Sequence, residues 1–280
     1  ERALDDLDLN FDIRAGAVIA LGKVGSTQEK FAARIASRLI DIMRNKSGKE
    51  HFSVEESGAL ALGLLQNKDA EILGALCDKA LDSRGKGNPR TRAFALLALG
   101  LLEVTKADAG YERVNETLNT IVKDESTDTN LPVCALTAMG LSGDPAHLDN
   151  LLAMVKTGKA YKVTKLNDLV RSYATSAVGR ILAKNANLVD KDRVDILKTA
   201  MTKCGPHTVR SAVIAFGQIS SESTERKLLS NMVQTLEYVV KKGENQASNF
   251  ALISLGKLAA SVSNAKLHGR IFDTLRTAMK

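Results

Sequence analysis

A glycine that recurs seven times at nearly constant spacing limits what this chain can fold into more than any other feature. Successive copies lie 37 to 41 residues apart, the residue just before each is large and apolar, and the residues two and five before it are small. A repeat of this length is typical of arrays of helical hairpins. The seven glycines are Gly22, Gly63, Gly100, Gly140, Gly179, Gly217 and Gly256.

The residues around each glycine share one face of a helix. Offsets of −5, −1 and +2 from the glycine lie on one face of a helix. The small residues therefore occur where a neighbouring helix must approach closely. Glycine inside a helix costs about 1 kcal/mol relative to alanine, and its recurrence at one register predicts a backbone crossing in every unit. A second amphipathic helix follows each glycine, for example one with Tyr111, Val114, Leu118 and Ile121 on its apolar face. The unit is therefore predicted to be a helical hairpin.

Composition agrees with an elongated helical array. The chain has 280 residues, four prolines, no tryptophan and 4% aromatic residues, and no apolar run reaches the roughly 20 residues that span a bilayer. We expect an all-α fold, a right-handed α-solenoid of about seven hairpins, in which residues 1–280 form a single array. Both ends fall in predicted helices without a polar capping repeat, so we expect a fragment of a longer array.

Two stretches, residues 92–100 and 170–179, resemble the second helix of HEAT repeats. The resemblance implies that the glycine helices line a concave face, and that an arginine eight residues before the glycine joins a ladder of hydrogen bonds between repeats. Arg14, Arg92 and Arg171 match that position, and we assign them a structural role rather than ligand contact. The ladder is expected to be incomplete, because the other repeats have Glu55, Pro132, Val209 and Ser248 there.

Positive charge collects in the second half of the chain and in loops. The net charge is +7, and residues 151–280 hold 21 Lys and Arg against 9 Asp and Glu. If the HEAT register applies, loops inside repeats stack along one edge and their basic residues form a ridge. Such a ridge either binds an anionic partner such as nucleic acid or only keeps the loops solvated. The ridge residues singled out as candidates are Arg84, Lys86, Arg90, Lys156, Lys159, Lys162 and Lys165.

The helices around Gly63 and Gly100 are hydrophobic on every side. Five residues lie off the predicted core stripe: Leu60, Leu64, Phe94, Leu97 and Leu101. A helix that is apolar all round is usually buried all round, but in an open array one side of it can instead line a groove for a partner helix or peptide. Tyr173, six residues before its glycine, is expected to face the same groove.

No motif for catalysis or metal binding is present. A complete phosphate-binding loop, Gly-x-Ser-x-Gly and His-Glu-x-x-His are all missing. The three cysteines are predicted to be buried free thiols, and the four histidines to face solvent or cap helices, so we expect no metal and no cofactor. An odd, sparse cysteine count is more typical of a reducing compartment.

The sequence favours a non-catalytic scaffold that binds a partner protein or peptide through the concave face and the loops inside repeats. The alternative is a binder of nucleic acid or an anionic surface that uses the basic C-terminal half. Some HEAT-like proteins are alkylpurine DNA glycosylases or phycobilin lyases, so the resemblance leaves a third hypothesis, an enzyme. Asp168 and Tyr173 are the pair that a glycosylase-like activity would use.

Overall fold

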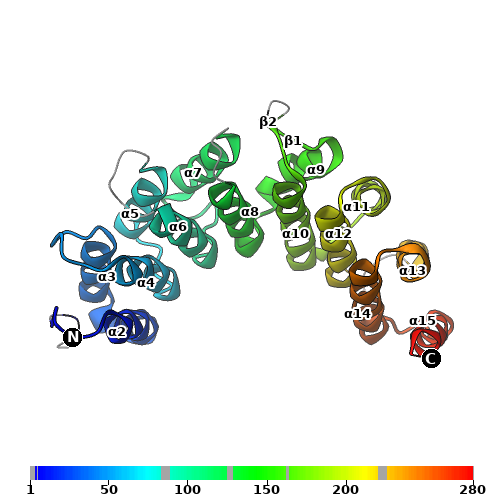
Figure 1. Ribbon diagram of the computed structural model, residues 1–280, viewed down its shortest axis with the longest axis horizontal. Helices are drawn as coiled ribbons and strands as arrows, with labels where there is room; N and C mark the ends of the chain where they lie inside the picture. The colour runs from blue at the N-terminus through cyan, green and yellow to red at the C-terminus, as the bar shows by residue number, and fades with distance from the viewer. Residues whose placement is uncertain are drawn as a thin grey trace. The chain divides into compact units, whose positions relative to one another are not determined.

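The structure is a computed structural model that describes residue 4 and residues 6–82, 89–124, 129–161, 164–219 and 226–279. The chain divides into two compact units, residues 1–142 (unit 1) and residues 143–280 (unit 2). Each unit is a stack of paired helices (Figure 1). Within the described ranges, every helix is too short or too polar to cross a membrane.

Unit 1 alternates glycine helices with outer helices. The glycine helices are α2 (Phe11–Gly25), α4 (Phe52–Leu64), α6 (Pro89–Leu101) and α8 (Asn130–Ser142), and the outer helices are α3 (Glu29–Met43), α5 (Ala70–Leu81) and α7 (Tyr111–Lys123). The glycine helices pack on one another in chain order, and each outer helix packs on the glycine helix that follows it. This is the predicted HEAT-like pairing, in which the outer helix precedes the glycine helix of its own repeat.

Unit 2 repeats the arrangement with one addition. Its elements are η1 (Pro145–His147), α9 (Leu148–Thr157), β1 (Lys159–Ala160), β2 (Thr164–Lys165), α10 (Asp168–Lys184), η2 (Ala186–Leu188), α11 (Lys191–Lys203), α12 (Pro206–Gln218), α13 (Arg226–Lys242), α14 (Asn245–Ser261) and α15 (Ala265–Ala278). The glycine helices α10, α12 and α14 lie side by side (Figure 1). The addition is an antiparallel ribbon formed by β1 and β2 between α9 and α10, which the periodicity did not predict.

The predicted close crossing requires the glycine at five positions but not at Gly256, where an added Cβ atom would meet nothing within 4 Å. A Cβ atom on Gly100 would lie 2.5 Å from the Cα atom of Ala138, the small residue two positions before the next glycine. The same clash, at 2.9 Å or less from the equivalent residue, occurs in the pairs Gly22–Ala61, Gly63–Ala98, Gly179–Ala215 and Gly217–Ser254. The large apolar residue before the glycine fills the core at four of these crossings, where Leu62, Leu99, Val178 and Phe216 are no more than 1% exposed, whereas Leu21 is half-buried. The small residues thus allow two helices to approach closely, and the large residues fill the core between them.

The arginines make structural hydrogen bonds, and the link between repeats that the HEAT resemblance implied is present at Arg14, whereas Arg92 and Arg171 bond within their own repeats. Arg92 Nε donates to the Ala80 carbonyl at 2.9 Å, and Arg171 Nε donates to the Val155 carbonyl at 3.0 Å. These carbonyls belong to the last turn of the outer helix of the same repeat, where no intrahelical N–H can reach them. Ser248 Oγ donates to Val240 in the same way at 3.0 Å. These bonds close their own hairpins, whereas Arg14 Nη2 also donates to Glu50 Oε2, in the loop of the next repeat, at 2.7 Å.

One histidine contradicts the prediction that all four face solvent or cap helices by their side chains. His147, at the junction of η1 and α9, is 6% exposed and makes no side-chain cap bond. Its burial in unit 2 lowers the pKa of the imidazole below 6.5, against the opposing effect of the nearby Asp144 carboxylate. His51, by contrast, caps α4, because its Nδ1 accepts a hydrogen bond from the Ser53 N–H at 3.3 Å.

The lowered pKa of His147 makes stability depend on pH. Near pH 6 the imidazole of His147 binds a proton more tightly in the unfolded chain than in the folded chain. The contribution of neutral His147 to the free energy of unfolding is therefore fully present above about pH 6.5 and is lost as the pH falls toward the folded pKa. We expect His147→Gln to lose less stability than the wild type between pH 7.5 and 5.5, as measured by urea unfolding at both values. His207→Gln, a change at an exposed histidine, should keep the wild-type difference. An unaltered difference in His147→Gln would contradict this assignment.

Candidate partner-binding site

Partly exposed leucines run across the glycine helices of unit 1. Leu60 and Leu64 on α4, and Phe94, Leu97 and Leu101 on α6, are all half-buried. We call these five residues the apolar strip. Their neighbours on the core side are fully covered, since Ala95, Leu96 and Ala98 are 0% exposed. The five residues are therefore neither core residues nor isolated surface residues.

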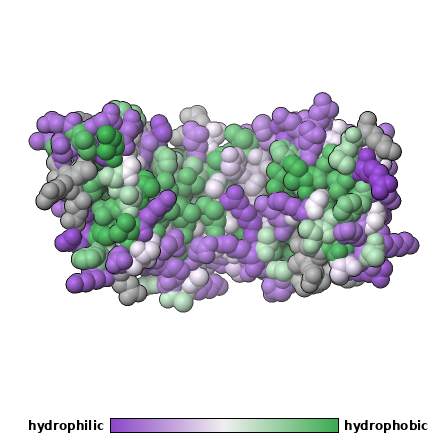
Figure 2. Space-filling view, turned by 90° about the horizontal axis from the view of Figure 1, so that it is seen from below, coloured by the Kyte–Doolittle hydropathy of each residue, from purple (hydrophilic) through white to green (hydrophobic). Residues whose placement is uncertain are grey.

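The apolar strip continues at matching positions on the flanking helices. Ile19 of α2 and Leu141 of α8 occupy the same offsets from their glycines as members of the strip, and both are half-buried. Figure 2 shows the molecule from below the view of Figure 1, and hydrophobic residues gather in it over unit 1 as well as over part of unit 2. Apolar surface that continues over neighbouring helices is typical of an interaction site.

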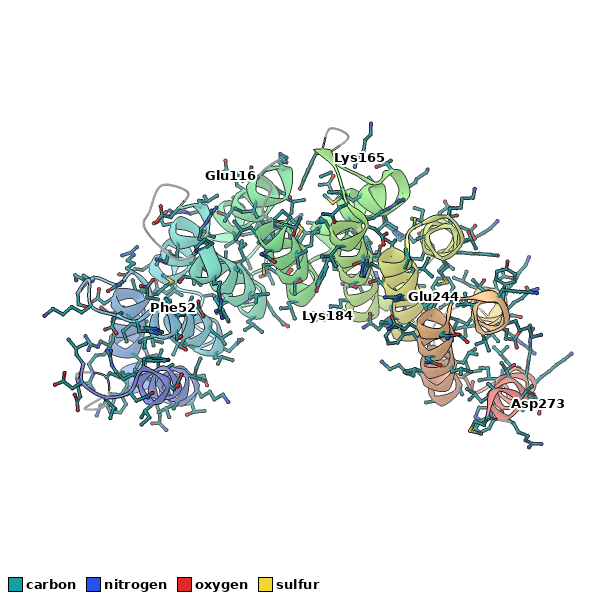
Figure 3. All side chains as sticks on the ribbon, in the orientation of Figure 1. Phe52, Glu116, Lys165, Lys184, Glu244 and Asp273 are labelled. Atoms are coloured by element: carbon teal, nitrogen blue, oxygen red, sulfur yellow. The ribbon has the colours of Figure 1, made fainter. Side chains whose placement is uncertain are left out.

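An exposed aromatic stack in unit 1 was missed by the sequence analysis. The His51 ring lies between Phe11 and Phe52, with ring centroids 4.0 Å and 3.9 Å apart, and the two phenylalanines are 41% and 43% exposed. Figure 3 labels Phe52 at the start of α4. A signal was present, because both phenylalanines stand eleven residues before their glycines. Aromatic side chains of this kind are frequent anchors in protein interfaces.

The predicted basic ridge is only partly described and, in unit 1, is partly neutralised. Arg84 and Lys86 lie outside the described residues. Arg90 is exposed, and its Nη2 lies 3.2 Å from a carboxylate oxygen of Glu56 on the neighbouring glycine helix. Two further loop cations pair with carboxylates, Arg44 with Asp78 at 3.9 Å and Lys46 with Asp41 at 3.3 Å. Ion pairing therefore accounts for much of this charge.

The remaining candidates belong to unit 2. Lys156, Lys159 and Lys165 are exposed around the β1–β2 ribbon, whereas Lys162 lies outside the described residues. Tyr173 is 37% exposed on α10, one turn from the similarly exposed Leu169. Tyr173 and the apolar strip thus belong to different units.

Asp168, the residue proposed for an enzymatic role, is engaged in a helix cap. Its carboxylate accepts a hydrogen bond from the His207 N–H at 2.8 Å and another from Thr208 Oγ1 at 2.7 Å, which joins the start of α10 to the start of α12. A Cβ atom on Gly205 would lie 2.6 Å or less from this carboxyl group. The contacts give Asp168 a structural function at the first turn of α12.

The cysteines are free thiols at different depths. Cys77 is buried, and Cys134 and Cys204 are half-buried. Burial is the main cause that raises the pKa of the Cys77 and Cys204 thiols, and a raised pKa reduces the reactive thiolate fraction. Across the residues that the structure describes, no three His, Cys, Asp or Glu side chains converge as metal ligands would.

No protein-family model matches this chain, and no curated protein matches its sequence. Among solved structures, the chain is similar to a designed armadillo repeat protein, with 13% identity over 79% of this chain and 98% of that one and a TM-score of 0.43. It is also similar to the complex of CpcE and CpcF of phycocyanin lyase from Nostoc sp., with 16% identity over 81% and 89% of the two chains and a TM-score of 0.41. Human deoxyhypusine hydroxylase in complex with glycerol matches with 17% identity over 92% and 82% of the two chains and a TM-score of 0.36.

Two features within each unit define the fold. The outer helix precedes its glycine helix in each pair, and a glycine meets a small residue at five helix crossings. These features, found within each unit, make the chain a HEAT-like helical-repeat protein.

Proposed function

We propose that this chain is a non-catalytic interaction scaffold, and that the apolar strip of unit 1 binds an amphipathic helix of a partner protein. The observation that carries the proposal is the partial exposure of leucine and phenylalanine side chains on two successive glycine helices, beside residues that are fully buried. Covering such side chains stabilises a complex by about 25 cal/mol per Å² of apolar surface before the costs of association.

The spacing of the glycine helices favours a helical partner. Neighbouring packed helices lie about 8–10 Å apart, and seven residues of an α-helix rise about 10.5 Å. A partner helix laid across α4 and α6 would thus place one residue of its apolar face, at seven-residue intervals, over each glycine helix. An extended strand advances about 10 Å in three residues. Because its side chains alternate between two faces, residues three apart point in opposite directions, and only every second one would face the glycine helices. A polyproline II segment repeats over about 9 Å, so it serves as the comparison ligand in the test.

The test uses a synthetic peptide with leucines seven residues apart on an otherwise charged helix. We expect the wild-type chain to bind this peptide, and Leu97→Ser with Leu101→Ser to weaken binding about tenfold or more, because two contacts with apolar side chains are lost. Fluorescence anisotropy of the labelled peptide gives the affinity. Since both leucines are already partly exposed, the double variant should retain the helical circular dichroism signal of the wild type.

Two controls distinguish this proposal from non-specific hydrophobic binding of the peptide. Ile253→Ser removes an apolar side chain that is 57% exposed on α14 of unit 2, and it should leave peptide binding unchanged. The same peptide with a central proline cannot form a continuous helix and should bind poorly. Equal binding of the proline-broken peptide, or tighter binding of a proline-rich peptide, would count against a helical partner.

A further inference from the structure

The ribbon between α9 and α10 brings two like charges face to face. Lys159 and Lys165 are direct partners in the antiparallel register of β1 and β2, and both are exposed. Figure 3 shows Lys165 where the ribbon projects beyond the helices of unit 2. Like charges at directly opposed positions destabilise a strand pair. Folding alone therefore gives no reason for lysine at both positions.

Two further lysines lie beside the ribbon. Lys156, in the last turn of α9, and Lys203, in the last turn of α11, line a shallow cavity of about 640 Å³. Thr157 lines the same cavity, and its Oγ1 accepts a hydrogen bond from the Lys159 N–H at 3.2 Å, so cavity and ribbon adjoin. In the described part of the chain, none of the four lysines takes part in an ion pair. We call Lys156, Lys159, Lys165 and Lys203 the lysine cluster.

Carboxylates limit the extent of this positive surface. Asp192 and Asp195 line the same cavity as Lys156 and Lys203, and Asp149 and Asp190 line an adjoining hollow that Lys156 also borders. A nucleic-acid backbone carries phosphates at every step, so a strand passing over the lysine cluster would run onto these carboxylates. A short acidic stretch of polypeptide can instead place its carboxylates on the lysines and end there.

The only aromatic side chain of the ribbon within the described residues is poorly placed for base stacking. Tyr161, next to β1, is half-buried, and burial raises its pKa to about 12. Proteins that bind single strands without sequence preference normally offer exposed rings on which successive bases stack. This observation, too, favours a peptide over a nucleic acid.

We propose that the lysine cluster binds a short acidic segment of a partner protein. The carboxylates of that segment would lie between Lys159 and Lys165 and relieve their mutual repulsion, as opposite charges do across a strand pair. Lys156 and Lys203 would extend the contact into the cavity. This site belongs to unit 2 and is independent of the apolar strip, so either proposal can fail without the other.

The experiment compares variants with equal loss of charge. Lys159→Thr with Lys165→Thr removes the opposed pair, and Lys241→Thr with Lys242→Thr removes two exposed lysines from the last turn of α13 in the same unit. The probes are an oligoglutamate peptide, an oligoglutamine peptide of equal length and a DNA duplex, each titrated at low and physiological salt. We expect the wild type to prefer oligoglutamate, and the ribbon variant to bind it about tenfold more weakly. The α13 variant should bind it within about threefold of the wild type.

Thermal unfolding of the variants tests whether a loss of binding results from misfolding. Because the ribbon variant removes a like-charge contact, its thermal midpoint should equal or exceed that of the wild type, and Lys156→Thr with Lys203→Thr supplies a second test away from the ribbon. Equal losses in the ribbon and α13 variants would reduce the effect to net charge and overturn the site. Tighter binding of the duplex, lost in the ribbon variant, would overturn the choice of an acidic peptide.

Discussion

Gly100→Ala is expected to destabilise unit 1 by about 1–2 kcal/mol, although alanine is the better helix former. The new Cβ atom would lie 2.5 Å from the Ala138 Cα atom and 2.9 Å from its carbonyl oxygen, so α6 and α8 must separate. Overpacking of this kind costs about 1–3 kcal/mol and more where backbone must move, which exceeds the gain of about 1 kcal/mol in helix propensity. Urea unfolding monitored by circular dichroism measures the loss.

Gly16→Ala is the matched control for that variant. Gly16 lies inside α2 of the same unit, and a Cβ atom there would meet nothing within 4 Å. The substitution should therefore raise the free energy of unfolding by about 0.5–1 kcal/mol, the ordinary difference between the two residues in a helix. Opposite signs for the two variants would support the close crossing. Stabilisation by both would mean that the glycine register serves some purpose other than helix contact.

Arg14→Met is expected to cost about 3–5 kcal/mol, because it leaves a buried carboxylate without its partner. Arg14 Nη2 lies 2.7 Å from Glu50 Oε2, and the two side chains are 4% and 7% exposed. The same Nη2 donates to the Leu4 carbonyl at 3.1 Å. The pair therefore holds the loop between α3 and α4 against α2, and chemical denaturation of the full chain is the appropriate measurement.

The double variant Arg14→Met with Glu50→Leu should recover much of this loss, since it removes both buried charges together. An exposed pair gives the comparison: Arg210 and Glu244 lie 2.6 Å apart, but their side chains are 26% and 43% exposed. Arg210→Met should have a much smaller effect, because water solvates the remaining carboxylate. A loss in Arg14→Met no larger than in Arg210→Met would contradict the importance of the buried pair.

The positions of the helices and of their close contacts could be predicted from the sequence, because close packing requires small residues at regular spacing along the chain. Where two backbones cross, only a glycine opposite Ala or Ser fits, so the register of the crossings can be read from one chain. The partial exposure of Leu97 and Leu101 could not be predicted in this way. An apolar residue off the core stripe is buried or exposed according to what packs over it, and that depends on neighbouring helices.

The lysine cluster and the aromatic stack show the same division. Strands of two residues have no period to detect, so the pairing of Lys159 with Lys165 followed only from the path of the loop. Phe11 and Phe52 share an offset, but the loop before α4 places His51 between them. His147 is buried at the junction of η1 and α9, although the sequence analysis expected it to face solvent or to cap a helix. The sequence by itself determined the repeat, its register and the need for close helix crossings, since these depend on residues at fixed spacing. Only the tertiary structure decided which side chains remain exposed to a partner, because exposure depends on contacts between residues that are distant along the chain.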